Sequence, residues 1–189
     1  MSLERTMSSF KPAVMLLTLS LLGCSQTHSL TDPVTGLAVS VEGDYLVENE
    51  APQGAYAAMI AVKGRNGHPF IPEETIVPIC TAAFQPMPDN APLTQAEINA
   101  GVPQWAAEIE AGMAQVMRFE TREPFEFKGI SGYKFVASPL GTFSAKMRIV
   151  LYVMETPKGR TVLNCSGHAE TLAKAMPTYD LIRDGVSPP

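Results

Sequence analysis

The sequence has little of what nucleic-acid binding and metal chemistry require. Its 189 residues include 14 lysines and arginines against 19 aspartates and glutamates, which gives a formal net charge of −5. No basic cluster interrupts this acidic balance, so the chain is a poor partner for phosphate backbones. It also has only three histidines and three cysteines. We therefore expect no nucleic-acid partner, no metal site and no cofactor.

Catalytic motifs are also missing. The chain has no G-x-S-x-G elbow, no glycine-rich phosphate loop and no H-E-x-x-H helix. His168-Ala-Glu170 matches half of a zinc-deaminase signature, but no P-C-x-x-C follows it. Ser166 and His168 offer a nucleophile and a base close in sequence, without a third group to orient them. The sequence predicts that the protein is not an enzyme, with a hydrolase built from scattered residues as the alternative.

No apolar run is long enough to cross a membrane. The longest, Ala13–Leu22, has ten uncharged residues, which as a helix would rise about 15 Å, half the hydrocarbon thickness. Arg5 and Lys11 precede it. A positive start followed by a short apolar run is typical of a secretory signal.

The run ends in Leu21-Leu22-Gly23-Cys24, which resembles the lipobox of bacterial lipoproteins, although a smaller residue than Leu22 is commoner at its position. That resemblance implies cleavage before Cys24 and lipid attachment to it, and several acyl chains would make the anchor durable. Ser25 stands where an aspartate commonly signals inner-membrane retention, so the resemblance implies an outer-membrane anchor facing the periplasm. The alternative is a plain secretory signal in which Cys24 is incidental.

The remaining chain has the size of one domain. Removing the signal peptide, residues 1–23, leaves 166 residues with a net charge of −6, because two basic residues and one acidic residue are lost. A chain of this length can bury a substantial core. We expect a flexible tether over 24–33, a single domain over 34–185 and a loose tail over 186–189.

Two cysteines are left once Cys24 is assigned to the anchor. Cys80 and Cys165 each end an apolar, strand-like segment. An even pair in an exported protein indicates a disulfide, and two separately buried thiols are the alternative.

Apolar periodicity predicts strands joined by two helices. Thr94 and Glu97 form a capping-box pattern, and an apolar stripe then continues to Val116. We interpret the stripe as core, with a ligand groove as the alternative, and we expect Pro103 to divide this helix. The second helix, 168–182, is expected to bend or break at Pro177. The expected strands are 37–41, 45–47, 55–62, 76–84, 119–127, 133–137, 145–155 and 160–166, the last two joined by a tight turn at 157–159.

This order of elements belongs to the α+β class. The segment Gly129–Val136, the hairpin Arg148–Cys165 and the closing helix that ends at Ile182 resemble the PsbP/Mog1-type fold, a group that includes lipoproteins similar to the DcrB family. The resemblance runs from about Leu30 to the end of the chain. It implies a central antiparallel sheet flanked by helices, an α/β/α sandwich, and an accessory or binding role.

The sequence therefore predicts a lipid-anchored envelope protein that binds another envelope protein or a small ligand. A structural envelope component and a periplasmic hydrolase are the alternatives. A partner surface would most economically lie on the loops 63–72 and 85–92, because binding residues concentrate on loops held by a rigid scaffold.

Overall fold

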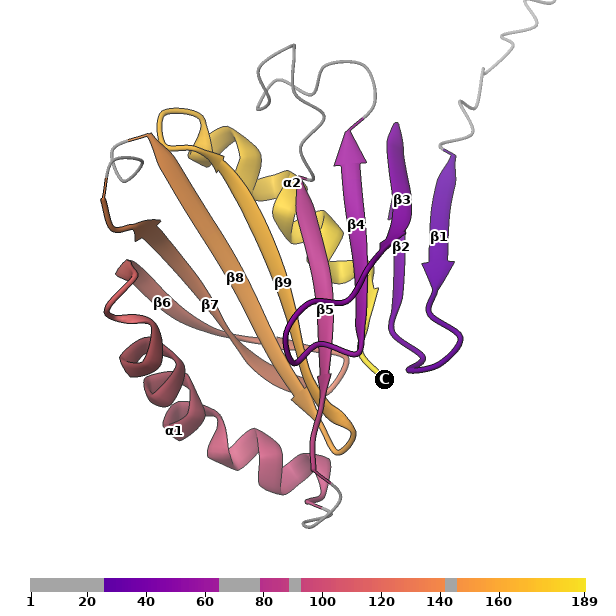
Figure 1. Ribbon diagram of the computed structural model, residues 1–189, viewed down its shortest axis with the longest axis vertical. Helices are drawn as coiled ribbons and strands as arrows, with labels where there is room; N and C mark the ends of the chain where they lie inside the picture. The colour runs from indigo at the N-terminus through magenta and orange to yellow at the C-terminus, as the bar shows by residue number, and fades with distance from the viewer. Residues whose placement is uncertain (1–25, 65–78, 89–92, 142–145) are drawn as a thin grey trace, which may run out of the picture.

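A seven-stranded antiparallel sheet forms the centre of the molecule (Figure 1). The computed structural model describes residues 26–64, 79–88, 93–141 and 146–189. The predicted strands are present, although 76–78 and 145, at the starts of two of them, lie outside the described residues. In sheet order the strands are β3 (Tyr45–Glu50), β4 (Ala58–Gly64), β5 (Cys80–Pro86), β9 (Gly159–His168), β8 (Met147–Thr156), β7 (Ile130–Pro139) and β6 (Met117–Phe127).

A second, three-stranded sheet corrects two predictions. Its strands are β1 (Thr27–Thr31), β2 (Ala38–Glu42) and β10 (Val186–Ser187), with β2 in the middle. Residues 27–31 of the expected tether therefore form a strand, paired in register from Thr27 with Glu42 to Thr31 with Ala38. The expected loose tail is also ordered, because Val186 is fully buried and pairs with Val39. The composition of the two ends predicted flexible segments, but hydrogen-bonded pairing with β2 holds both in place.

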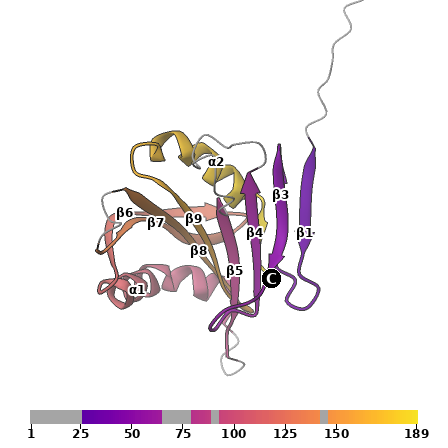
Figure 2. The same cartoon turned by 45° about the horizontal axis from the view of Figure 1, so that its top comes forward.

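The two helices cover opposite faces of the large sheet, as the predicted sandwich requires (Figure 2). Successive strand residues point to opposite faces. On β8, Val150, Tyr152 and Met154 belong to the core cluster that contains α2 (Leu172–Asp184), whereas Leu151 and Val153 belong to the cluster that contains α1 (Gln95–Met113). The fold is α+β and dominated by its sheets.

Helix α1 is continuous through Pro103, so the predicted division of this helix was wrong. Its start is as predicted: the Thr94 amide donates to a Glu97 carboxylate oxygen at 2.7 Å, and the Glu97 amide donates back to the Thr94 hydroxyl. An internal proline costs about 3 kcal/mol. Val102 and Trp105, on either side of Pro103, are buried against the sheet, and this packing holds the helix together while the proline is exposed.

Helix α2 continues through Pro177 for the same reason. Ala175 precedes the proline, Tyr179 and Ile182 follow it, and all three are fully buried. The expected break is therefore absent. Tyr179 and Ile182 belong to the core cluster on this face of the sheet, and Leu172 and Met176 pack partly buried against the same cluster.

Two glycines allow close approach of the backbone where elements meet. Gly159, in the hairpin between β8 and β9, has a φ of +154°, and a Cβ there would lie 2.2 Å from the Gln85 carbonyl oxygen. At Gly185, which follows α2, a Cβ would lie 1.9 Å from the Ser40 carbonyl oxygen. A side chain at Gly159 would push β5 away from the hairpin, and a side chain at Gly185 would push β2 away from the end of α2. Both close approaches therefore require glycine.

A candidate binding groove beside helix α1

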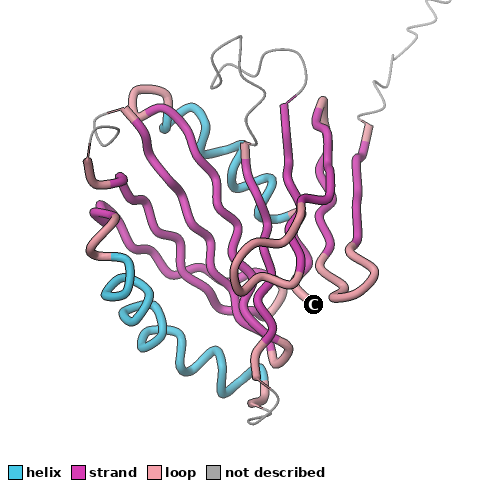
Figure 3. Tube along the Cα trace, in the orientation of Figure 1, coloured by secondary structure: helices cyan, strands magenta, loops and turns pink. Residues whose placement is uncertain are grey.

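Helix α1 covers only part of its face of the sheet. Its buried residues Val102, Trp105 and Ala106 share a core cluster with side chains of β7 and β8. In Figures 1 and 3 the C-terminal half of α1 runs towards β6, away from β4 and β5. A groove lined by the C-terminal part of α1 lies between the helix and the part of the sheet that it leaves uncovered.

The groove has a volume of about 470 Å³. One wall is the C-terminal part of α1 with the start of β6, and the floor is the α1-facing side of β4, β5, β8 and β9. Its lining is mainly apolar side chains, which is the usual composition of a small-molecule site. The apolar side chains are Met59, Ala83, Ile109, Met113, Met117, Leu151, Val153 and Val162.

Strand register places polar groups at both ends of the groove and apolar groups between them. On β5 and β9 the facing pairs are Thr81 with Asn164, Ala83 with Val162, and Gln85 with Arg160. The first and third pairs are polar, and the middle pair is apolar. From Thr81 to Gln85 the strand advances four residues, about 13 Å. The groove is thus a short trough with hydrogen-bonding ends.

One charged side chain lines the groove within the described part of the chain, and it is neutralised in place. The Arg160 Nε donates to Glu155 Oε1 at 2.6 Å, and a second guanidinium nitrogen lies 2.5 Å from the same oxygen. Glu155 is only 6% exposed. The guanidinium also lies over the Trp105 ring, 5.7 Å from its centroid, an arrangement that favours a cation. Arg160 is therefore held between Glu155 and Trp105, and the pair adds no net charge to the groove.

The predicted stripe on α1 divides into two parts. Ile98, Val102 and Trp105 are buried, as the core interpretation requires. Ile109 and Met113 line the groove and are only partly buried. The ligand groove that was the alternative interpretation therefore describes the second half of the same helix.

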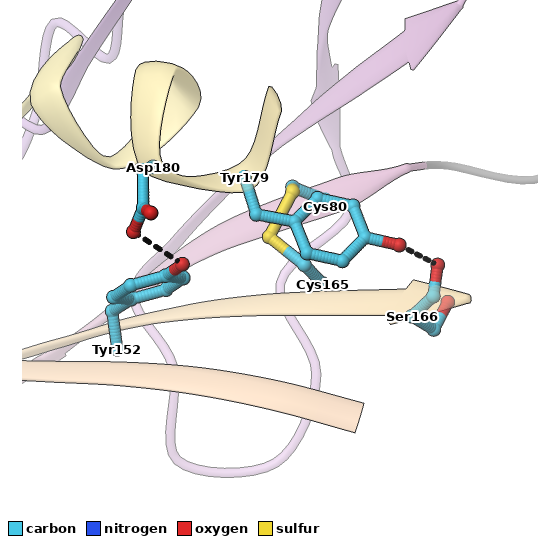
Figure 4. The surroundings of a disulfide bond; sticks show 6 residues. All are labelled: Cys80, Tyr152, Cys165, Ser166, Tyr179 and Asp180. Atoms are coloured by element: carbon cyan, nitrogen blue, oxygen red, sulfur yellow. Dashed lines mark hydrogen bonds between the residues drawn. A yellow bond between two sulfur atoms is a disulfide. The ribbon is translucent and has the colours of Figure 1, made fainter. Parts of the chain in front are cut away.

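Cys80 and Cys165 form the predicted disulfide. They occupy directly opposed positions on β5 and β9, with Cα atoms 4.0 Å apart. Both residues are at most 1% exposed, in the core cluster on the α2 side of the sheet (Figure 4). The disulfide covalently links the two central strands β5 and β9 on the face opposite the groove, and we assign it a structural role.

Two buried tyrosines attach α2 to the sheet above this bridge (Figure 4). The Tyr179 hydroxyl donates to the Ser166 carbonyl oxygen at 2.9 Å, and burial raises the pKa of Tyr179 to about 12. The Tyr152 hydroxyl donates to Asp180 at 2.9 Å; burial, and then the adjacent carboxylate, raise the pKa of Tyr152. Both phenols stay neutral at ordinary pH and act as hydrogen-bond donors that orient the helix.

The residues considered for hydrolysis are not assembled into a site among the described residues. Cys165 is in the disulfide. Ser166 pairs with Ile149 across the ladder, while His168 is exposed at the end of β9. No hydrogen bond of the described part of the chain joins the Ser166 side chain to His168.

Several predicted features fall outside the described residues. These are the leader, Cys24, and most of the two loops expected to carry a partner surface. Where the chain is described, no group of three His, Cys, Asp or Glu side chains is placed to hold a metal ion. Neither described helix combines the length and apolarity that a membrane crossing requires.

Sequence reasoning offered a ligand groove only as the alternative interpretation of the α1 stripe, and it missed the floor of the groove. The floor residues alternate with core residues on β5 and β9, and on each strand only the central one of the three, Ala83 or Val162, is apolar. Such a mostly polar face indicates solvent exposure in the sequence, so the pattern did not show that α1 partly covers it.

Comparison with known proteins identifies the fold. No family model and no curated protein matches the sequence. The solution structure of cyanobacterial PsbP (CyanoP) from Synechocystis sp. PCC 6803 superposes with a TM-score of 0.55 at 8% identity, covering 92% of this chain and 99% of that one. Two crystal structures score below 0.5 and carry no argument: LpqN, involved in cell envelope biogenesis of Mycobacterium tuberculosis (0.49, 14% identity, 87% and 91% covered), and PA94 of Pseudomonas aeruginosa (0.44, 9% identity, 79% and 91% covered). The chain has a PsbP-like fold.

Proposed function

We propose that the protein is a binding module of the cell envelope and that its site is the groove between α1 and the strands β4, β5 and β9. The observation that carries this proposal is the groove: about 470 Å³ of mainly apolar surface with hydrogen-bonding groups at its ends. Pockets of this size and composition are typical of small-molecule sites. A purely structural domain would gain stability by filling such a space.

The envelope location rests on the leader. Residues 13–24 have the lipobox pattern, so Cys24 carries lipid and anchors the domain to the outer membrane. A Cys24→Ser variant tests this anchor: it should lose its membrane fractionation, and its leader should remain uncut. Membrane association and normal cleavage in that variant would contradict the lipid anchor.

A binding role is favoured over hydrolysis because no nucleophile with a base is found among the described residues that line the groove. The hydroxyl and amide side chains of this lining are Tyr56, Thr81, Gln85 and Asn164, and Arg160 is paired with Glu155. An activated nucleophile needs a base within hydrogen-bond reach and a group that orients the base. The groove residues supply hydrogen bonds and apolar contact, which suit recognition of a ligand.

The single tryptophan of the chain makes the binding test specific to this site. Trp105 contacts Arg160, which lines the groove. N-phenyl-1-naphthylamine, an uncharged apolar dye, should bind residues 24–189 with Cys24→Ser, expressed without the leader and called the Cys24→Ser protein below, and it should receive excitation energy from Trp105. Titration should show Trp105 emission falling as dye emission rises, to saturation at one dye per chain.

Two glycines of α1 provide a matched pair of variants. Gly112 lines the groove and Gly101 does not, and at both positions a Cβ would meet nothing within 4 Å. Replacing an internal helix glycine removes a cost of about 1 kcal/mol, so neither change should unfold the protein. Gly112→Phe should place a ring in the groove and weaken dye binding by about tenfold or more, while Gly101→Phe should leave it unchanged. Equal binding by both variants would show that the dye sits elsewhere and would refute the proposed site.

A further inference from the structure

We infer that the groove selects uncharged amphiphiles with a single alkyl chain, excluding both anionic and cationic head groups; this inference rests on the proposed function. Three features of the described groove lead to it: its balanced charge, the position of its polar groups, and a floor whose backbone hydrogen bonds are all made within the sheet.

The charge of the groove is balanced inside its own wall. Arg160 is paired with Glu155 through two nitrogen–oxygen contacts, and Glu155 is 6% exposed. An anionic head group that drew Arg160 away would leave a nearly buried carboxylate unpaired, which is strongly unfavourable. A cationic head group would meet Arg160 itself. The groove therefore disfavours ligands of either charge. Arg160 alone would indicate a site for anionic ligands, but its pairing with Glu155 removes that preference.

The uncharged polar side chains at the two ends of the groove can form hydrogen bonds with an uncharged head group of a ligand. At one end Thr81 and Asn164 face each other across β5 and β9, and at the other end Gln85 lies opposite Arg160. Hydroxyl and amide side chains both donate and accept hydrogen bonds, so they match a hydroxyl, ester or amide group of a ligand. Thr81 and Gln85 lie about 13 Å apart along β5, and between these polar ends the floor is apolar at Ala83 and Val162, which suits one extended alkyl chain.

The floor gives a peptide no main-chain partners. Strand β5 pairs with β4 and β9, and β9 pairs with β5 and β8, so both central strands have their ladder positions occupied on both sides. Strand addition derives its affinity from main-chain hydrogen bonds at an open sheet edge. The floor of the groove lies on the face of the sheet, and the edge strand β6 contributes only Met117 to its wall. A polypeptide segment bound on that floor would leave its own amides unpaired. An alkyl chain has no such requirement.

The test measures displacement of N-phenyl-1-naphthylamine by three ligands with equal chains: 1-decanol, decanoate and decyltrimethylammonium, all at pH 7.5 with the Cys24→Ser protein. Decanol should bind at least about tenfold more tightly than either ion, and the two ions should agree within about threefold, because the groove has no net charge. Each methylene added from hexanol to decanol should strengthen binding about fourfold. Decanoate binding as tightly as decanol, or a preference of more than tenfold for one ion over the other, would overturn the inference.

A second variant tests the cause of this selectivity. Glu155→Gln keeps the shape of the side chain and leaves Arg160 without its counter-charge. Decanoate affinity should rise about tenfold, decyltrimethylammonium affinity should fall, and decanol affinity should stay unchanged. The matched control is Glu123→Gln, which breaks an ion pair of similar length, 2.6 Å to Lys134, away from the groove; it should change none of the three.

The outcomes separate this inference from the proposed function. If the dye fails to bind, the proposed function fails, and the ligand class fails with it. If the dye binds in the groove but the ions compete as well as decanol, only the ligand class is wrong. If Glu155→Gln folds but does not favour decanoate, the charge balance between Arg160 and Glu155 is not the cause of selection. Should that variant not fold, the comparison of the two ions on the unchanged groove decides the inference by itself.

Discussion

Reducing the disulfide between Cys80 and Cys165 should remove a large part of the domain's stability. The bridge closes a loop with a sequence separation of 85 residues. On the chain-entropy model, a loop of that length constrains the unfolded chain by about 4.5 kcal/mol. Single domains are stable by about 5 to 15 kcal/mol. The reduced protein should therefore remain folded with a much smaller margin.

The measurement is urea unfolding of one protein in two redox states. Because both sulfurs are buried under α2, reduction needs the unfolded chain, so the Cys24→Ser protein is reduced in urea and refolded with reductant present. With a slope of about 2 kcal/mol per molar urea for a domain of this size, the midpoint should fall by about 2 M. The slope should rise, because the uncrosslinked chain exposes more surface on unfolding.

The comparison between redox states isolates the crosslink, since no side chain is removed. A Cys80→Ala/Cys165→Ala variant should show no response to reductant, which controls for other effects of the reagent. Its midpoint should lie below that of the reduced protein, because truncating two fully buried side chains also leaves a cavity. A difference below about 1 kcal/mol between oxidised and reduced protein would refute the assignment of this bridge as the main staple of the central strands.

Three further predictions concern elements that hold the fold. Gly185→Ala should destabilise the domain by several kcal/mol, because its Cβ would overlap the Ser40 carbonyl oxygen, whereas Gly101→Ala, with open space around its Cβ, should stabilise it by about 1 kcal/mol; chemical denaturation of both variants measures the contrast. Tyr179→Phe should cost about 1 to 2 kcal/mol by leaving a backbone carbonyl without its donor. Folding raises the pKa of Tyr179 from 10 to about 12. The stability that this residue contributes is therefore complete below pH 10 and is lost as the pH rises towards 12. The melting temperature of Tyr179→Phe should accordingly fall less steeply with alkaline pH than that of the unchanged protein. Thr94→Ala should cost about 1 kcal/mol by removing the capping box of α1, and an undiminished melting temperature would contradict that role.

Local patterns in the sequence predicted the elements well wherever a single element determines its own conformation. The capping box at Thr94 and Glu97 predicted the start of α1, because the two side chains satisfy each other's backbone amides within one turn. Two apolar segments joined by a tight turn at 157–159 predicted the hairpin of β8 and β9. The disulfide was also within reach of the sequence, since assigning Cys24 to the predicted anchor leaves two cysteines, which allow only one internal pairing.

The wrong predictions share one cause, which is packing between elements distant in sequence. Pro103 and Pro177 are strong local signals for a helix end, yet buried neighbours on both sides of each proline hold its helix together. The expected tether and tail became strands because β2 lies between them and pairs with both. None of these partners is close in sequence, so no local pattern reports them.

What the sequence by itself determined is which face of each element is apolar and the class of fold; the leader over residues 1–23 stays a prediction. The sequence could not determine what covers each apolar face. The stripe on α1 has one periodicity throughout, but Trp105 is buried while Ile109 and Met113 line an open groove. The course of the helix over the sheet, towards β6 and away from β4 and β5 (Figure 1), decides this difference, and it is set only when the whole sheet is assembled. The pairing of Arg160 with Glu155, which leaves the groove without net charge, is set by the same assembly.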